Sequence, residues 1–180
     1  MYEVELKVAA DHDAVRERLA DLDAEPLGRV RQADTYYDAP HRAFAETDEA
    51  LRLRRESADD GAGETRVTYK GPLVEAASKT REEFETGVDD GETMDAILRA
   101  LGFSPAATVE KERERFAVRG YTVTLDAVSD LGTYVEVERG GVEGEVESLR
   151  EGACEVLSDL GLDPDAQIRT SYLGLLLADA

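Results

Sequence analysis

Three charged residues alternate with aliphatic ones at the start of the chain. Glu3, Glu5 and Lys7 are each followed by an aliphatic residue. In a β-strand this period of two places the three charges on one face and the aliphatic side chains on the other. Carboxylates can hold a divalent cation, and an ammonium group beside them can hold an anionic oxygen. The pattern predicts either a strand that binds both ions or an amphipathic strand with a solvated face.

The same alternation recurs in later segments, where basic residues often stand at positions i and i+2. The charged residues on these faces are Arg52, Arg54, Arg66, Lys70, Arg81, Glu83, Glu85, Lys111, Arg113, Arg115, Asp126, Glu136 and Glu138. With Lys7 of the first strand included, three of the four lysines lie on such faces, although acidic residues outnumber basic ones 41 to 21. A solvated face in such a chain would be mostly acidic, so the basic pairs indicate a face that meets a polyphosphate.

Periodicity and turn residues predict about eight strands and four helices. The strands are expected near residues 1–8, 29–37, 50–56, 64–70, 80–87, 109–118, 121–128 and 133–139. The helices are expected at 11–22, 92–101, 143–160 and 167–178. Tight turns such as Arg119-Gly120 make neighbouring strands antiparallel. Residues 73–79 are expected to form a mobile link, and could act as a lid.

The recurrence of charged faces predicts an α+β fold in a single domain, residues 1–180. We expect a closed antiparallel β-barrel of about eight strands, with a charged tunnel inside and amphipathic helices packed outside. Such a barrel can enclose one small ligand. The alternative is an open antiparallel sheet with one solvated, salt-bridged face. Glu110, Glu112 and Glu114 make the other face of their strand polar and are expected to be surface acids.

The net charge of −20 disfavours nucleic acid and anionic membrane as partners. Acid excess with few lysines favours a halophile, whose cytoplasm screens self-repulsion with salt. No apolar run is long enough to span a membrane, and no signal peptide is recognised. A cytoplasmic location is therefore expected.

The ordered set of these motifs resembles the CYTH superfamily of triphosphate tunnel metalloenzymes. That group includes class IV adenylyl cyclases, thiamine triphosphatases and inorganic triphosphatases. Glu3-Val4-Glu5-Leu6-Lys7 matches its opening motif. The other matches are Asp34-Thr35-Tyr36-Tyr37-Asp38, Arg52-x-Arg54, Lys70, Glu83-x-Glu85, Lys111-x-Arg113, Asp126, Glu136-x-Glu138 and Ser171-Tyr172-Leu173.

The resemblance implies a role for each matched residue and a Mg²⁺ or Mn²⁺ cofactor. The triphosphate-binding residues would be Lys7, Arg52, Arg54, Lys70, Lys111 and Arg113. The metal-binding residues would be Glu3, Glu5, Asp126, Glu136 and Glu138, and the catalytic residues Glu5, Lys7 and Lys70. Glu83 and Glu85 could either bind metal or pair with tunnel arginines.

The resemblance also implies an enzyme acting on a nucleoside or inorganic triphosphate, as a possible homodimer. Length and the Ser171-Tyr172 ending favour class IV adenylyl cyclase, which converts ATP to cyclic AMP and pyrophosphate. The alternative is an inorganic, nucleoside or thiamine triphosphatase. The absence of tryptophan makes thiamine triphosphate the weaker choice. A third reading is a non-catalytic binder of polyphosphate or nucleotide, which would not need the carboxylates.

Overall fold

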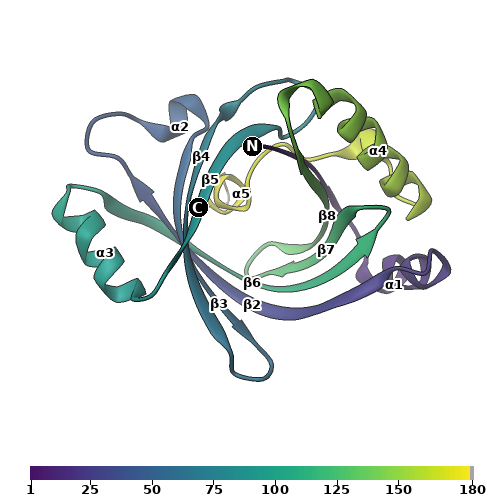
Figure 1. Cartoon of the computed structure of the whole chain (residues 1–180), viewed down its shortest axis with the longest axis horizontal. Coiled ribbons are helices and arrows are strands. Elements are labelled where there is room, and N and C mark those ends of the chain that lie inside the picture. The colour runs from purple at the N-terminus through teal and green to yellow at the C-terminus, as the bar shows by residue number, and fades with distance from the viewer. Residues whose placement is uncertain (179–180) are drawn as a thin grey trace.

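Eight strands close into one antiparallel barrel in the computed structural model, which describes residues 1–178 (Figure 1). The order around the barrel is β1, β5, β4, β3, β2, β6, β7 and β8, and β8 pairs with β1 again. The strands are β1 (Tyr2–Ala9), β2 (Glu25–Asp38), β3 (Ala50–Ala58), β4 (Gly63–Leu73), β5 (Arg81–Val88), β6 (Ser104–Val118), β7 (Tyr121–Val128) and β8 (Gly132–Gly141). The barrel predicted from the alternating charges is confirmed.

The β6–β7 hairpin sets the register of the inward-facing residues. Its two turn residues both have positive φ, 51° at Arg119 and 81° at Gly120, as the tight turn favoured by twisted strands requires. The resulting register places Arg113 opposite Asp126, while β8 places Glu136 opposite Thr124. Charges from three consecutive strands therefore meet on the inner wall.

The main hydrophobic core lies outside the barrel wall, between strands and helices. The helices are α1 (His12–Asp21), α2 (Phe44–Thr47), α3 (Gly91–Ala100), α4 (Val146–Asp159) and α5 (Tyr172–Ala178). α1 and α4 cover β1, β7 and β8 with residues such as Leu19 and Leu157, against Leu6 and Val137. α3 covers β3 through Leu98. α2 was not predicted from the sequence, because a single turn is too short for a helical period to show.

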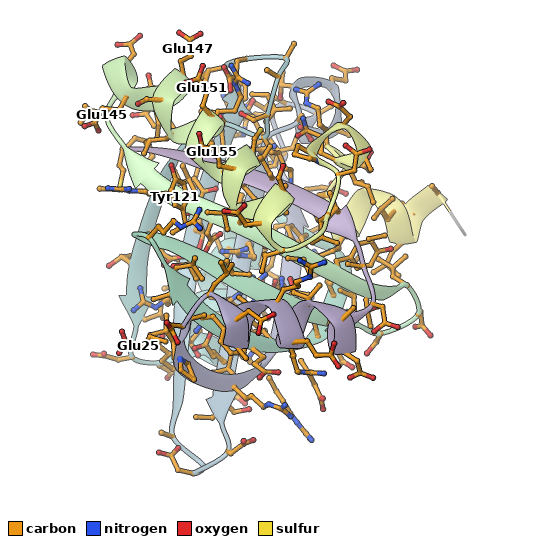
Figure 2. All side chains as sticks on the ribbon, turned by 90° about the vertical axis from the view of Figure 1, so that its right-hand side faces the viewer. Glu25, Tyr121, Glu145, Glu147, Glu151 and Glu155 are labelled. Atoms are coloured by element: carbon orange, nitrogen blue, oxygen red, sulfur yellow. The ribbon has the colours of Figure 1, made fainter. Side chains whose placement is uncertain are left out.

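The last helix begins at Tyr172, whereas the sequence predicts its start at residue 167. A 3₁₀ turn, Pro164–Ala166, precedes an extended segment whose Ile168 N–H donates to the carbonyl of Lys7 at 2.6 Å. That bond to β1 replaces the helical bonds of residues 167–171. α5 lies within the outline of the ring in Figure 1, and the side view in Figure 2 places it at one end of the barrel.

Charged side chains of the inner wall are buried, although no apolar core surrounds them. Lys7 is 1% exposed, Glu136 4% and Arg113 6%, whereas Val4 and Leu6 on the other face of β1 are fully buried under the helices. These values contradict an open sheet with a solvated face.

The outer surface carries the excess of acid. Glu147, Glu151 and Glu155 point away from the barrel along the exposed side of α4 (Figure 2). Glu112 is exposed on the outer face of β6 and pairs with Arg31 at 3.2 Å, as expected for a surface acid. Within residues 1–178, none of the helices has the length and apolar character needed to cross a membrane.

Candidate active site

A cavity of about 1050 Å³ occupies the barrel, and all eight strands contribute to its lining. Its wall carries almost every residue that the sequence predicts for the site. Those residues are Glu3, Glu5, Lys7, Arg52, Arg54, Lys70, Glu83, Glu85, Lys111, Arg113, Glu136 and Glu138. Asp126 is fully buried behind this wall and does not line the cavity.

Three carboxylates converge on one point of the wall. Glu5 lies opposite Glu138 in the β1–β8 register, and Glu3 is two residues before Glu5 on the same face. One oxygen from each of the three lies within 4.8 Å of the others. We call Glu3, Glu5 and Glu138 the acid cluster.

The positive charges near the acid cluster do not offset the burial and mutual repulsion of its carboxylates. Burial, aided by the charges of Glu136 and Glu5 and opposed by Arg113, raises the pKa of Glu138 to about 7. Burial and the charge of Glu138 also raise the pKa of Glu3. Oε1 of Glu5 is buried without a hydrogen-bond donor among residues 1–178. Crowded oxygens with an unsatisfied acceptor suit a hard divalent cation, so the residues present fit Mg²⁺ or Mn²⁺.

Two other predicted metal ligands are committed to an arginine instead. Arg113 donates to both oxygens of Asp126, at 2.7 and 2.6 Å, and to Glu136 at 2.9 Å. Asp126 also accepts from the Tyr172 hydroxyl at 2.8 Å. Burial alone would raise the pKa of Glu136, but the charges of Arg113, Lys111 and Lys7 hold it far below its usual range. The structure therefore does not bring Asp126 or Glu136 into the acid cluster.

The arginines of the wall are held by neighbours but keep donors for a ligand. Arg54 makes a two-pronged bond to Asp34, with both distances 2.7 Å. Arg52 donates to Thr68 at 3.2 Å and lies 3.5 Å from Glu85, while its Nε has no acceptor among the described residues. A guanidinium has five N–H donors, so both can still receive phosphate oxygens.

The three predicted lysines differ in how they are held. Lys70 donates to Glu83 at 2.7 Å, and the charges of its acidic neighbours outweigh burial and raise its pKa. Lys7 donates to the carbonyl of Thr170 at 2.6 Å. Among residues 1–178, Lys111 forms one ion pair, a long one of 3.8 Å to Asp34. Burial and the charge of Arg113 lower the pKa of Lys111 to about 7, and burial and Lys79 lower that of Lys7 to about 8. An anion in the cavity would stabilise the charged form of both.

Glu83 and Glu85 are partners of basic residues, which was one of the two predicted roles. Glu83 accepts from Lys70, and Glu85 accepts from Thr68 at 2.7 Å and from Arg66 at 3.1 Å. Neither belongs to the acid cluster.

No site role is predicted from the sequence for Lys79, Arg169 or Tyr172, which also line the cavity, although Tyr172 belongs to one of the matched motifs. Lys79 precedes β5, and its ammonium lies 3.8 Å from Oε1 of Glu5. Arg169 and Tyr172 come from the C-terminal segment. One signal could have revealed Lys79. The strongly acidic chain has only four lysines, and the other three were all predicted to lie in the site.

The link that carries Lys79 is anchored, although the sequence predicts it to be mobile. Ser78 and Thr80 are fully buried and bond to each other at 2.5 Å. Gln167 donates to the carbonyl of Ala77 at 2.8 Å, and Arg169 to that of Glu75 at 3.0 Å. These bonds hold the link against the C-terminal segment and fix the backbone of Lys79.

Comparison with known proteins agrees with this geometry. A Methanocaldococcus jannaschii protein described as a "putative adenylate cyclase" is 38% identical over 177 residues, covering 97% of this chain and 98% of its own. The solved structure of the PH1819 protein of Pyrococcus horikoshii matches this chain with a TM-score of 0.91 and 99% of each chain covered. The two sequences are 37% identical. The HpAC1 protein of Hippeastrum shares the fold at 18% identity and a TM-score of 0.67, covering 99% of this chain and 95% of its own. The CYTH domain family matches residues 1–172, and the chain belongs to that family.

Proposed function

We propose that this protein is a metal-dependent enzyme that acts on a triphosphate inside the barrel, and that its main reaction converts ATP to cyclic AMP and pyrophosphate. One observation carries the proposal. An acid cluster whose nearest ammonium, that of Lys79, is 3.8 Å away shares a cavity with two buried lysines, Lys7 and Lys111, that have no close carboxylate partner among the described residues. A triphosphate bound together with a divalent metal supplies both missing charges.

The basic wall binds and orients the triphosphate. Arg52, Arg54 and Arg113 offer guanidinium donors from two strands, β3 and β6, while Lys7 and Lys111 supply point charges. Lys79 adds a further charge from the anchored link. Fixed donors in a buried site stabilise the negative charge that develops on a departing pyrophosphate. Lys70, held by Glu83, contributes charge and not a proton acceptor, because its pKa is raised.

Glu3, Glu5 and Glu138 would hold Mg²⁺ or Mn²⁺ in the same cavity. When bound, such a cation neutralises phosphate charge and makes the phosphorus under attack more electrophilic. Glu136 lies next to the acid cluster on β8, and its charge already balances Arg113. We therefore assign Glu136 and Asp126 to positioning Arg113.

In the cyclase reaction the ribose 3′-oxygen of ATP attacks the α-phosphorus. The bond from that phosphorus to the oxygen bridging the α- and β-phosphates breaks, pyrophosphate leaves with that oxygen, and the proton of the 3′-hydroxyl is released to solvent. The protein holds the two reacting ends of ATP in one orientation, which supplies much of the acceleration in such reactions. The adenylate cyclase description of the 38% identical relative supports this choice.

A triphosphatase is the second candidate, because the same basic wall serves a reaction in which water attacks the terminal phosphorus. The Hippeastrum structure is described as a putative adenylyl cyclase that "reveals a dominant" triphosphatase activity. Proteins of one fold can therefore favour attack on the α-phosphorus or on the terminal phosphorus.

Product analysis separates the candidates. The protein is incubated with ATP or tripolyphosphate and Mg²⁺ or Mn²⁺, in molar KCl because its net charge of −20 favours screening by salt. Cyclic AMP with an equal amount of pyrophosphate is the expected result from ATP. Orthophosphate without cyclic AMP would assign the triphosphatase reaction. Tight binding without any product would contradict both and leave a non-catalytic binder.

A further inference from the structure

The C-terminal segment holds one residue of the basic wall at three places. Ile168 N–H donates to the Lys7 carbonyl at 2.6 Å, and the Thr170 carbonyl accepts from the Lys7 ammonium at 2.6 Å. The Tyr172 ring lies beneath the same ammonium, with 4.3 Å from Nζ to the ring centroid. Residues more than 160 positions away in the sequence thus hold the backbone carbonyl of Lys7, one N–H donor of its ammonium group, and the side of that ammonium that faces the Tyr172 ring.

Tyr172 also contacts other parts of the basic wall. The ammonium of Lys111 lies 4.9 Å from the centroid of its ring. Its hydroxyl donates to Asp126 at 2.8 Å, and Asp126 in turn grips Arg113 with both oxygens. The Tyr172 side chain therefore contacts Lys7 and Lys111 directly, and it reaches Arg113 through the carboxylate of Asp126.

The end of the barrel is shaped to receive this tyrosine. Beyond the charged zone, apolar residues replace the charges and pack around Tyr172 together with Tyr134, whose ring centroid is 5.2 Å away. The neighbours from the strands include Val109 and Val128. Tyr172 is only 5% exposed, and its ring contacts both the two lysines and this apolar cluster.

We propose that Tyr172 is a positioning residue for triphosphate binding: its ring aims the ammonium groups of Lys7 and Lys111 into the cavity, and its hydroxyl steadies the Asp126–Arg113 pair. A ring face attracts a cation most strongly where water is excluded. With their undersides against the ring, both ammoniums direct their remaining donors toward the ligand. This inference depends on the proposed function, since it needs a triphosphate as the ligand.

Two substitutions separate the ring from the hydroxyl. Tyr172→Phe keeps the ring and loses the bond to Asp126, so we expect affinity for tripolyphosphate within about threefold of wild type. Tyr172→Met keeps an apolar, adaptable side chain but removes the ring, and we expect affinity about tenfold weaker. Binding is measured by calorimetry on metal-free protein. Tyr134→Leu is the matched control, because it removes an aromatic ring from the same apolar cluster, and we expect it to weaken binding less than Tyr172→Met does.

Lysine signals give an independent readout, because the chain has only four lysines. In protein labelled with ¹³C-lysine, NMR should show the ε-methylene signals of Lys7 and Lys111 displaced by the Tyr172 ring current. The displacement should persist in Tyr172→Phe and vanish in Tyr172→Met, and tripolyphosphate should shift the same two signals in wild type. This spectrum still tests the inference through wild type and Tyr172→Phe if Tyr172→Met does not fold.

Three outcomes would overturn the inference. In the first, Tyr172→Met binds tripolyphosphate as wild type does. In the second, Tyr134→Leu loses as much affinity as Tyr172→Met, which would reduce Tyr172 to ordinary packing. In the third, tripolyphosphate leaves the two displaced signals unmoved. Wild type that binds no tripolyphosphate at all would overturn the proposed function as well, which distinguishes the two failures.

Discussion

Two groups of carboxylates share one barrel, yet their surroundings are opposite. Asp126 and Glu136 accept close bonds from Arg113, and Asp34 is gripped in the same way by Arg54. Glu3, Glu5 and Glu138 face one another, and no arginine of residues 1–178 forms an ion pair with them. The first group has close arginine partners, whereas the second has only the ammonium of Lys79, 3.8 Å from Glu5, and is left short of positive charge.

The contrast shows that a charged tunnel contains both acids paired within the protein and acids that a cation could still bind. A buried carboxylate matched by a guanidinium is part of the scaffold, because removing either partner leaves a charge uncompensated. A buried carboxylate crowded by its own kind costs free energy until a cation binds. Balance of charge, and not position on the strand, therefore separates the two roles in this fold.

The largest loss of stability should come from removing the arginine that pairs with Asp126 and Glu136. Arg113→Met leaves Asp126 and Glu136 as buried charges without their main partner, so we expect the free energy of unfolding to fall by about 3–5 kcal/mol. Urea denaturation in molar KCl measures it. The control is Arg31→Met, which removes an exposed pair with Glu112 and should cost less than about 1 kcal/mol. Equal losses from the two variants would contradict the structural role of Arg113.

The acid cluster should respond in the opposite way to substitution. Glu5→Gln removes one of the crowded charges, so the metal-free protein should keep its stability within about 1 kcal/mol. Metal-stimulated turnover should fall by about 100-fold or more, since metal coordination supplies several kcal/mol to such reactions. Steady-state assays over a range of Mn²⁺ concentrations test this. Turnover within a few-fold of wild type would remove Glu5 from the metal site.

A rise in pH should weaken tripolyphosphate binding by the lysines and strengthen Mn²⁺ binding by the acid cluster. Lys7 and Lys111 have pKa values of about 8 and 7, so they lose charge as pH rises from 6 to 9, and metal-free tripolyphosphate binding should weaken. The expected limit is about tenfold per pH unit for each lysine above its pKa. Glu138, with a pKa of about 7, gains charge over the same range, so Mn²⁺ binding should strengthen.

Calorimetry at several pH values with each ligand alone measures these two slopes. Lys111→Arg keeps its charge throughout and should flatten the tripolyphosphate slope between pH 7 and 8. Slopes of the same sign for both ligands would contradict the assignment of opposite charges to the two halves of the site.

The sequence predicts much of this architecture, because alternation of charge is a local property. The strand faces, the tight turn at Arg119-Gly120 and the inward-facing lysines could all be read from it. The division between Glu138 and Asp126 could not, since each is simply an inward acid on its strand. Only the register of Asp126 against Arg113, set across the β6–β7 hairpin, distinguishes them. Tyr172 is likewise placed by tertiary packing, far in sequence from the lysines that it contacts.

Lys79 gives the smallest and most discriminating test of the comparison, because it reaches the acid cluster from a loop and not from a strand. Its ammonium lies 3.8 Å from Glu5 and its charge helps to lower the pKa of Lys7, so it belongs to both halves of the site. Lys79→Met should weaken metal-free tripolyphosphate binding by about three- to fivefold, the scale expected for one hydrogen bond. The same variant should strengthen Mn²⁺ binding, because it removes a competing positive charge from Glu5. Lys79→Arg is the control and should shift neither affinity by more than about twofold. If Lys79→Met weakened the binding of both tripolyphosphate and Mn²⁺, the role of Lys79 would be to support the link that carries it. The prediction that Lys79 competes with a metal ion for the acid cluster would then be wrong.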